Sequence, residues 1–187
     1  MRLSRRFRDY RHAAALEEIA TSFLPRFPEL RHLDFELDLL PSSSWHLGVT
    51  EQDRLPPRIR LRPARPTNPS LTYVIPHEFT HLLQRPLGLV PSGERSCDLY
   101  AMARAGESFR VSPGYLRVPR AIRPEWPLWA PVATSLAREA LRERSAGRRT
   151  YIAWWESEFR RRVARGITPI DAFPPPADSG APAPGAA

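Results

Sequence analysis

The spacing of apolar residues in the first third of the chain predicts one helix followed by a small sheet. Apolar side chains recur at helical spacing over residues 9–24, and Pro25 ends that segment. Residues 33–39 alternate Leu and Phe with Asp and Glu, a period of two that is typical of a half-buried strand. Two more short strands are expected over 45–49 and 58–62. In the second of these, arginine alternates with aliphatic residues between two prolines, so we expect it at the edge of the sheet.

Two helices are expected in the middle of the chain. The first spans residues 70–85 and contains Pro76, which should kink this helix or mark its true start because proline removes a backbone hydrogen bond. After a short loop, a second helix is expected over residues 93–105. Ser92 is the candidate N-cap of this helix, and Gly106 would close it.

The residue pattern in the last third of the chain predicts two more helices and an unstructured tail. Residues 107–125 are expected to be irregular, whereas 127–145 and 148–165 each carry an apolar stripe at helical spacing. The segment 171–187 is rich in Pro, Ala and Gly with little to bury, so we expect it to be disordered. We therefore expect an α+β fold in a single domain, residues 1–170, with a short mixed sheet of about three strands.

Composition and charge limit the kinds of partner that the chain can bind and the cellular compartment that suits it. Of the 187 residues, 28 are basic, all of them arginine, and the net charge is +8. Such a chain invites a nucleic-acid hypothesis, but the arginines are scattered and form no long basic block. The arginine-rich start, residues 1–12, is expected to be a solvated lead-in to the first helix. No apolar run is long enough for a membrane, and the single cysteine, Cys97, suits a reducing compartment, so we expect a cytoplasmic monomer.

Residues 77–81 read His-Glu-Phe-Thr-His, the HExxH pattern, and they dominate any functional interpretation. On a helix, positions i and i+4 share a face, so His77 and His81 can reach one metal ion. Glu78 would then lie where its carboxylate can take a proton from a water on that ion. Residue types and spacing both match this chemistry.

A catalytic zinc usually needs a third protein ligand, and no histidine follows His81. Cys97 is a candidate, although a small buried thiol is the simpler interpretation. Glu94 and Asp98 are better candidates because they are four residues apart on the predicted helix that follows the motif helix, and so share one face. One can bind the metal while the other accepts the spare ring N–H of a histidine. Three upstream histidines are expected at the surface or at strand ends: His12, His32 and His46.

The motif and the sequence Glu94-Arg95-Ser96-Cys97-Asp98 together resemble the gluzincins, zinc peptidases with HExxH followed by ExxxD on the next helix. The resemblance covers residues 76–105, and the short separation between the motifs is similar to the compact minigluzincins. It implies a zincin-like fold, with one zinc ion held by His77, His81 and Glu94. It also implies that Glu78 is the catalytic base and that Asp98 supports a ligand histidine. An aspzincin-like site, with Asp98 as the third ligand, is the main variant.

On this interpretation the chain is a zinc-dependent endopeptidase, and its partner is a peptide or protein substrate. Zinc would lower the pKa of a bound water, and Glu78 would take the proton as the oxygen attacks a peptide carbonyl. Gluzincins usually add a donor for the developing oxyanion, and Tyr100 and Tyr115 are the candidates here. The predicted edge strand could bind an extended peptide by strand addition. Its arginines are Arg58, Arg60 and Arg62.

Two other functions remain open from the sequence. The first is a non-catalytic, zinc-stabilised interaction module that uses the arginine surface and the tryptophan-rich C-terminal helices, although core packing explains these tryptophans more simply. The second is a nucleic-acid-associated protease similar to SprT-like enzymes, which also often carry proline before HExxH but normally use a third histidine. The tryptophans are Trp126, Trp129, Trp154 and Trp155.

Overall fold

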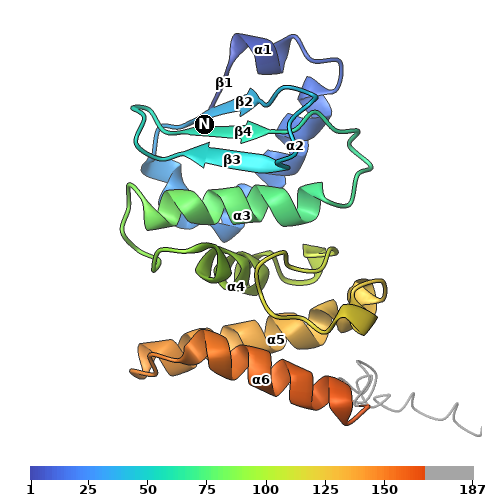
Figure 1. Cartoon of the computed structure of the whole chain (residues 1–187). Helices are drawn as coiled ribbons and strands as arrows, with labels where there is room; N and C mark the ends of the chain where they lie inside the picture. Colours follow the sequence, from blue (N-terminus) through green and yellow to red (C-terminus); the bar gives the residue numbers. More distant parts are fainter. Residues whose placement is uncertain (167–187) are drawn as a thin grey trace, which may run out of the picture.

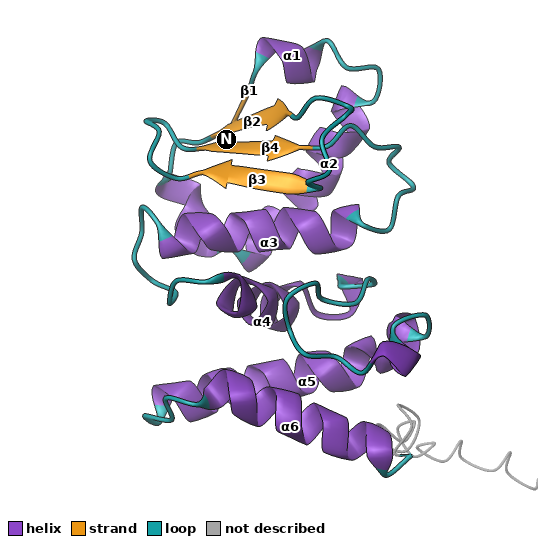
Figure 2. Ribbon diagram, in the orientation of Figure 1, coloured by secondary structure: helices purple, strands orange, loops and turns teal. Residues whose placement is uncertain are grey.

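Six α-helices and a four-stranded mixed sheet make up residues 1–166, the part of the chain that this computed structural model describes. Figure 1 shows the sheet at one end of the molecule, with the later helices stacked in successive layers away from it. The coarse α+β prediction is confirmed (Figure 2). The helices are α1 (Arg5–Arg8), α2 (Ala13–Phe23), α3 (Leu71–Gln84), α4 (Glu94–Ala105), α5 (Trp126–Ser145) and α6 (Tyr151–Ala164), with 3₁₀ turns at Leu24–Arg26, Pro28–His32, Gly106–Ser108 and Arg120–Ile122.

The sheet has the order β1-β2-β4-β3, in which the first two pairs are parallel and the last is antiparallel. Its strands are β1 (Arg2–Leu3), β2 (Glu36–Leu39), β3 (Gly48–Glu51) and β4 (Arg58–Leu61). Side chains alternate across it as the sequence pattern indicates, and Leu37, Ile59 and Leu61 are buried in the core.

The prediction that the arginine-rich strand lies at the sheet edge is wrong, because β4 lies between β2 and β3. Its arginines are tolerated there because carboxylates on the neighbouring strands face them. Arg58 Nε donates to Glu36 Oε2 at 2.9 Å, and Arg60 Nη1 donates to Glu51 Oε1 at 3.2 Å. Asp38 on β2 also lies within ion-pairing distance of both arginines. Cross-strand charge pairing thus replaces the solvent exposure that the sequence alone suggested.

The N-terminal segment is part of the fold, so its interpretation as a solvated lead-in is also wrong. Arg2 and Leu3 form β1, a strand beyond the three that were predicted, and pair in parallel with β2. Ser4 caps α1 by accepting from the Phe7 backbone N–H at 3.0 Å, and its hydroxyl donates to Asp38 at 2.6 Å. The Phe7 side chain is fully buried. A two-residue strand has no periodicity that a sequence pattern can reveal.

Helix α3 runs unbroken through Pro76, so proline neither begins nor ends it. The Thr80 hydroxyl also donates to the Pro76 carbonyl, one turn back along the helix, at 2.8 Å. The helix is buried on nearly all sides because it packs between the sheet and α4 (Figure 1). Residues on α3 are therefore held rigidly between two layers.

The start of α4 differs from the prediction. Gly93, rather than Ser92, is the N-cap, and its φ of 105° lies in the region that only glycine adopts readily. No side chain caps this end of the helix, so its first turn depends on tertiary contacts. Gly106 closes the helix as expected, with a φ of 62°.

The two C-terminal helices pack as a pair against α4, and their tryptophans belong mainly to the core. Trp126 and Trp155 are almost fully buried, and the Trp155 ring stacks on Phe159 with centroids 5.0 Å apart. Core packing therefore accounts for them better than a partner-binding face. None of the helices in residues 1–166 has both the length and the apolar character needed to cross a bilayer. The predicted tail, 171–187, and the end of the predicted domain lie outside the described residues.

Candidate metal centre

Helices α3 and α4 bring the predicted ligand residues to a single point. His77 Nε2 lies 3.0 Å from Glu94 Oε2, and His81 Nε2 lies 3.3 Å from the same oxygen. The two imidazoles come from successive turns of α3, with ring centroids 4.9 Å apart. Glu94 comes from the first turn of α4. The helical spacing in both motifs therefore produces the convergence that the sequence predicts.

These distances suit a tetrahedral ion. With metal–nitrogen bonds of about 2.0–2.1 Å, neighbouring ligand atoms of a tetrahedron lie about 3.3 Å apart. The separations of 3.0 and 3.3 Å are close to that edge length. The charges around the site also favour a cation. The carboxylates of Glu78, Glu94 and Asp98 surround the imidazoles of His77 and His81. Burial opposes a charged imidazole, yet hydrogen bonds to Asp98 and Glu94 raise the pKa of His77 to about 10. The site favours positive charge.

Asp98 holds the His77 ring from behind. Its Oδ1 lies 2.9 Å from His77 Nδ1, and Oδ2 accepts the backbone N–H groups of Tyr115 at 2.6 Å and Leu116 at 3.1 Å. The side chain is fully buried. Because both oxygens are engaged away from the two Nε2 atoms, the geometry favours Glu94 over Asp98 as the third ligand.

Gln84 contacts Nδ1 of His81, as Asp98 contacts Nδ1 of His77, and so orients the ring. Its side-chain nitrogen donates to the carbonyls of Pro91 at 2.6 Å and Gly93 at 3.0 Å, so its oxygen faces His81 Nδ1 at 3.0 Å. When Nδ1 donates to Gln84, the Nε2 lone pair is directed at Glu94. Gln52 Nε2 lies 3.2 Å from the same Nδ1 and competes with Gln84, because an amide nitrogen can only donate. The sequence pattern did not predict this role for Gln84. The available signal was a polar residue three positions after His81 on a buried helix.

Cys97 also lies at the centre, and His77, His81 and Cys97 form a largely buried group that could hold a metal ion. Its sulfur is 3.2 Å from His81 Nδ1, the nitrogen that also lies beside Gln84. Burial and the surrounding carboxylates raise the pKa of the Cys97 thiol. The thiol therefore stays protonated unless a cation displaces its proton.

Glu78 is buried beside the two histidines, and strand β3 holds it in place. Its Oε2 accepts from the Thr50 hydroxyl at 2.7 Å. Gly48 lies so close that a Cβ atom there would be 2.6 Å from Glu78 Oε1. Burial raises the pKa of Glu78, although His77 and His81 oppose the shift. A buried carboxylate with a raised pKa is a stronger base than a solvated one.

A cleft of about 250 Å³ opens beside His77 and Glu78. Tyr115 lies at its rim, half-exposed, with its ring stacked on His77 at a centroid distance of 5.6 Å. Trp45 is 82% exposed at the mouth, and its ring lies against that of His46 at an interplanar angle of 32°. Tyr100 is not brought to this cleft, because its hydroxyl accepts from Arg144 on α5. The lining residues are Trp45, His46, Leu47, Gly48, Tyr73, Val74, His77, Glu78, Gly114 and Tyr115.

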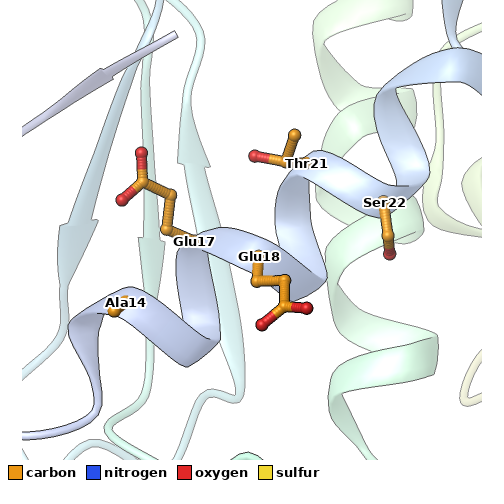
Figure 3. A pocket seen from close by; sticks show the side chains of 5 residues that line it. All are labelled: Ala14, Glu17, Glu18, Thr21 and Ser22. Atoms are coloured by element: carbon orange, nitrogen blue, oxygen red, sulfur yellow. The ribbon is translucent and has the colours of Figure 1, made fainter.

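A second hollow, of about 470 Å³, lies on the outer face of α2. Its lining comes from that helix alone, and Figure 3 shows the carboxylates of Glu17 and Glu18 pointing apart rather than converging. Neither histidine nor cysteine contributes to it. The chemistry-bearing residues are therefore gathered in the cleft beside α3.

Comparisons with protein-family models, with curated proteins and with solved structures returned no match to this chain.

Proposed function

We propose that this protein is a zinc-dependent endopeptidase of the gluzincin type with a zincin-like fold. The observation that carries the proposal is the convergence of His77 Nε2 and His81 Nε2 on Glu94 Oε2, with buried Glu78 alongside. We assign His77, His81 and Glu94 as the protein ligands of one zinc ion, which leaves a fourth position open.

Each residue then has a distinct task. Bound Zn²⁺ would supply Lewis-acid chemistry, lowering the pKa of a water and polarising a peptide carbonyl. Glu78 takes the proton of the attacking water and passes it to the leaving amine. Thr50 keeps the Glu78 carboxylate oriented through its 2.7 Å hydrogen bond. We assign to Tyr115, at the rim of the cleft, the hydrogen bond to the developing oxyanion.

Strand β3 is the candidate substrate strand in place of β4. It is an edge of the sheet, packs on α3 and contributes Gly48 and Thr50 to the surroundings of Glu78. Arg62 donates its backbone N–H to Leu47, and bonds alternate along an antiparallel pair. The N–H and C=O groups of Gly48 and Thr50 therefore point away from β4, toward the open edge. An extended peptide can pair with them by strand addition.

Zinc content and cleavage of a peptide library together test the function. The parent should bind one zinc per chain and cut susceptible peptides, whereas Glu78→Gln should keep the zinc and lose cleavage. Equal cleavage by Glu78→Gln and the parent would refute the assignment of the base. Zinc binding that raises the melting temperature, with no peptide cut by the parent, would instead favour the non-catalytic, zinc-stabilised module.

A further inference from the structure

A buried carboxylate on α6 reaches two segments that shape the metal centre. Glu156 is 4% exposed. Its Oε2 accepts from Arg95 Nη2 at 2.6 Å, and its Oε1 accepts from Arg95 Nε at 3.1 Å. The same Oε1 accepts the backbone N–H of Arg117 at 2.9 Å. One side chain thus joins the start of α4 to the loop that precedes α5.

We propose that Glu156 is a positioning residue for the metal centre, an inference that rests on the proposed function for its catalytic consequences. Arg95 directly follows Glu94, whose carboxylate meets both histidines. Arg117 directly follows Leu116. The backbone N–H groups of Leu116 and Tyr115 donate to Asp98, the carboxylate that contacts His77. Glu156 therefore sets the positions of Glu94, the proposed third ligand, and of Asp98, which supports His77.

The start of α4 needs such an anchor. Its N-cap is Gly93, with no side-chain cap, and the Glu94 side chain is 47% exposed. The point from which Glu94 reaches the two histidines therefore depends on the backbone of this first turn. The fork of Arg95 on Glu156 is a charge-assisted, bidentate pair, which fixes geometry more closely than a single bond. The first turn of α4 is thereby tied to α6.

Glu156→Gln tests the inference, and Glu158→Gln is its matched control. Glu158 lies two residues further along the same helix and pairs with Arg161 and Arg162 near the surface. The zinc dissociation constant is measured by competition with a chelator, and visible absorption of the Co²⁺-substituted protein reports ligand geometry. We expect Glu156→Gln to weaken zinc binding about tenfold and alter the Co²⁺ spectrum. Glu158→Gln should leave both unchanged.

Catalysis provides a further readout. Glu156→Gln should lower kcat with a smaller effect on KM, because it disturbs the centre rather than the substrate strand. If Glu156→Gln does not fold, Arg95→Lys takes its place, since it keeps the charge but loses the fork. It should weaken zinc binding in the same direction by a smaller factor.

The outcomes separate this inference from the proposed function. A Glu156→Gln protein that is merely less heat-stable, with the zinc affinity and Co²⁺ spectrum of the parent, would overturn the positioning role and leave the function standing. A parent that binds zinc but cuts no peptide would overturn the peptidase proposal, while a tenfold loss of affinity would still support Glu156. A parent that binds no metal would overturn both.

Discussion

Substituting Gly48 by alanine should disable the proposed base while sparing the metal ligands. The backbone of Gly48 tolerates alanine because its φ is not positive. The new Cβ would lie 2.6 Å from Glu78 Oε1, 2.7 Å from Val74 Cγ1 and 2.8 Å from Glu78 Cγ, whereas ordinary contact begins at 3.4 Å. Restoring ordinary contact with Oε1 requires the Glu78 carboxylate to retreat by about 0.8 Å, and the Val74 side chain must shift as well.

A displacement of that size has two measurable costs. Overpacking of a tight contact typically lowers the free energy of unfolding by about 1–3 kcal/mol. A misplacement near 1 Å at a reacting group can cost about 10²-fold in rate. We therefore expect Gly48→Ala to bind zinc as the parent does, to lose about 1–3 kcal/mol of stability in urea without metal, and to cleave about a hundredfold more slowly.

The control is Val49→Ala, because successive residues of a strand point to opposite faces. Val49 is the neighbour of Gly48 on β3 but directs its side chain away from Glu78, so cleavage should stay near the parental rate. Unchanged stability and unchanged cleavage in Gly48→Ala would refute the close approach of β3 to Glu78. Loss of zinc from Gly48→Ala would show that the strand supports the ligands rather than the base.

If Glu94 is the third ligand, Glu94→Ala should weaken zinc binding by at least about tenfold, whereas Cys97→Ser should leave the zinc dissociation constant unchanged. Weaker binding in Cys97→Ser with unchanged binding in Glu94→Ala would assign the Cys97 sulfur as the ligand instead. A hydrogen bond from Arg104 lowers the pKa of Glu29 despite partial burial. The stabilisation from this pair should therefore be fully present above the unfolded pKa and vanish as pH falls through the lower folded pKa. Glu29→Gln should cost about 1 kcal/mol in urea unfolding at neutral pH and nothing well below pH 4.5, and a constant cost would contradict the pairing. Trp45→Ala should raise KM several-fold for peptides with large apolar side chains near the scissile bond and little for small ones, and equal effects would place Trp45 outside the substrate path.

The convergence of ligand residues was predictable because it depends on local helical geometry. The spacing of His77 to His81, and of Glu94 to Asp98, places each pair on one face of a helix whatever the rest of the fold does. The two helices are joined by a short loop, so they pack side by side. Pattern alone was enough for this part of the centre.

The partners that hold Glu78 and the ligands were not predictable, because they come from distant segments. Thr50 and Gly48 reach Glu78 only once the sheet has assembled, and nothing in their local sequence marks that contact. The central position of β4 escaped prediction for a similar reason. Its arginines are neutralised by cross-strand carboxylates whose register the sequence does not show.

The short connection between α3 and α4 has a consequence for how the protein folds. Seventeen positions separate His77 from Glu94, whereas 28 separate Thr50 from Glu78 and 61 separate Arg95 from Glu156. Closing the 61-residue separation costs about 1 kcal/mol more chain entropy than closing the 17-residue one. We therefore expect the helical hairpin that carries His77, Glu78, His81 and Glu94 to form early, and the contacts that hold it in place, from Thr50 to Glu78 and from Glu156 to Arg95, to form later. The order of assembly thus separates the side chains of the centre, which lie on two neighbouring helices, from their supports in the sheet and in α6.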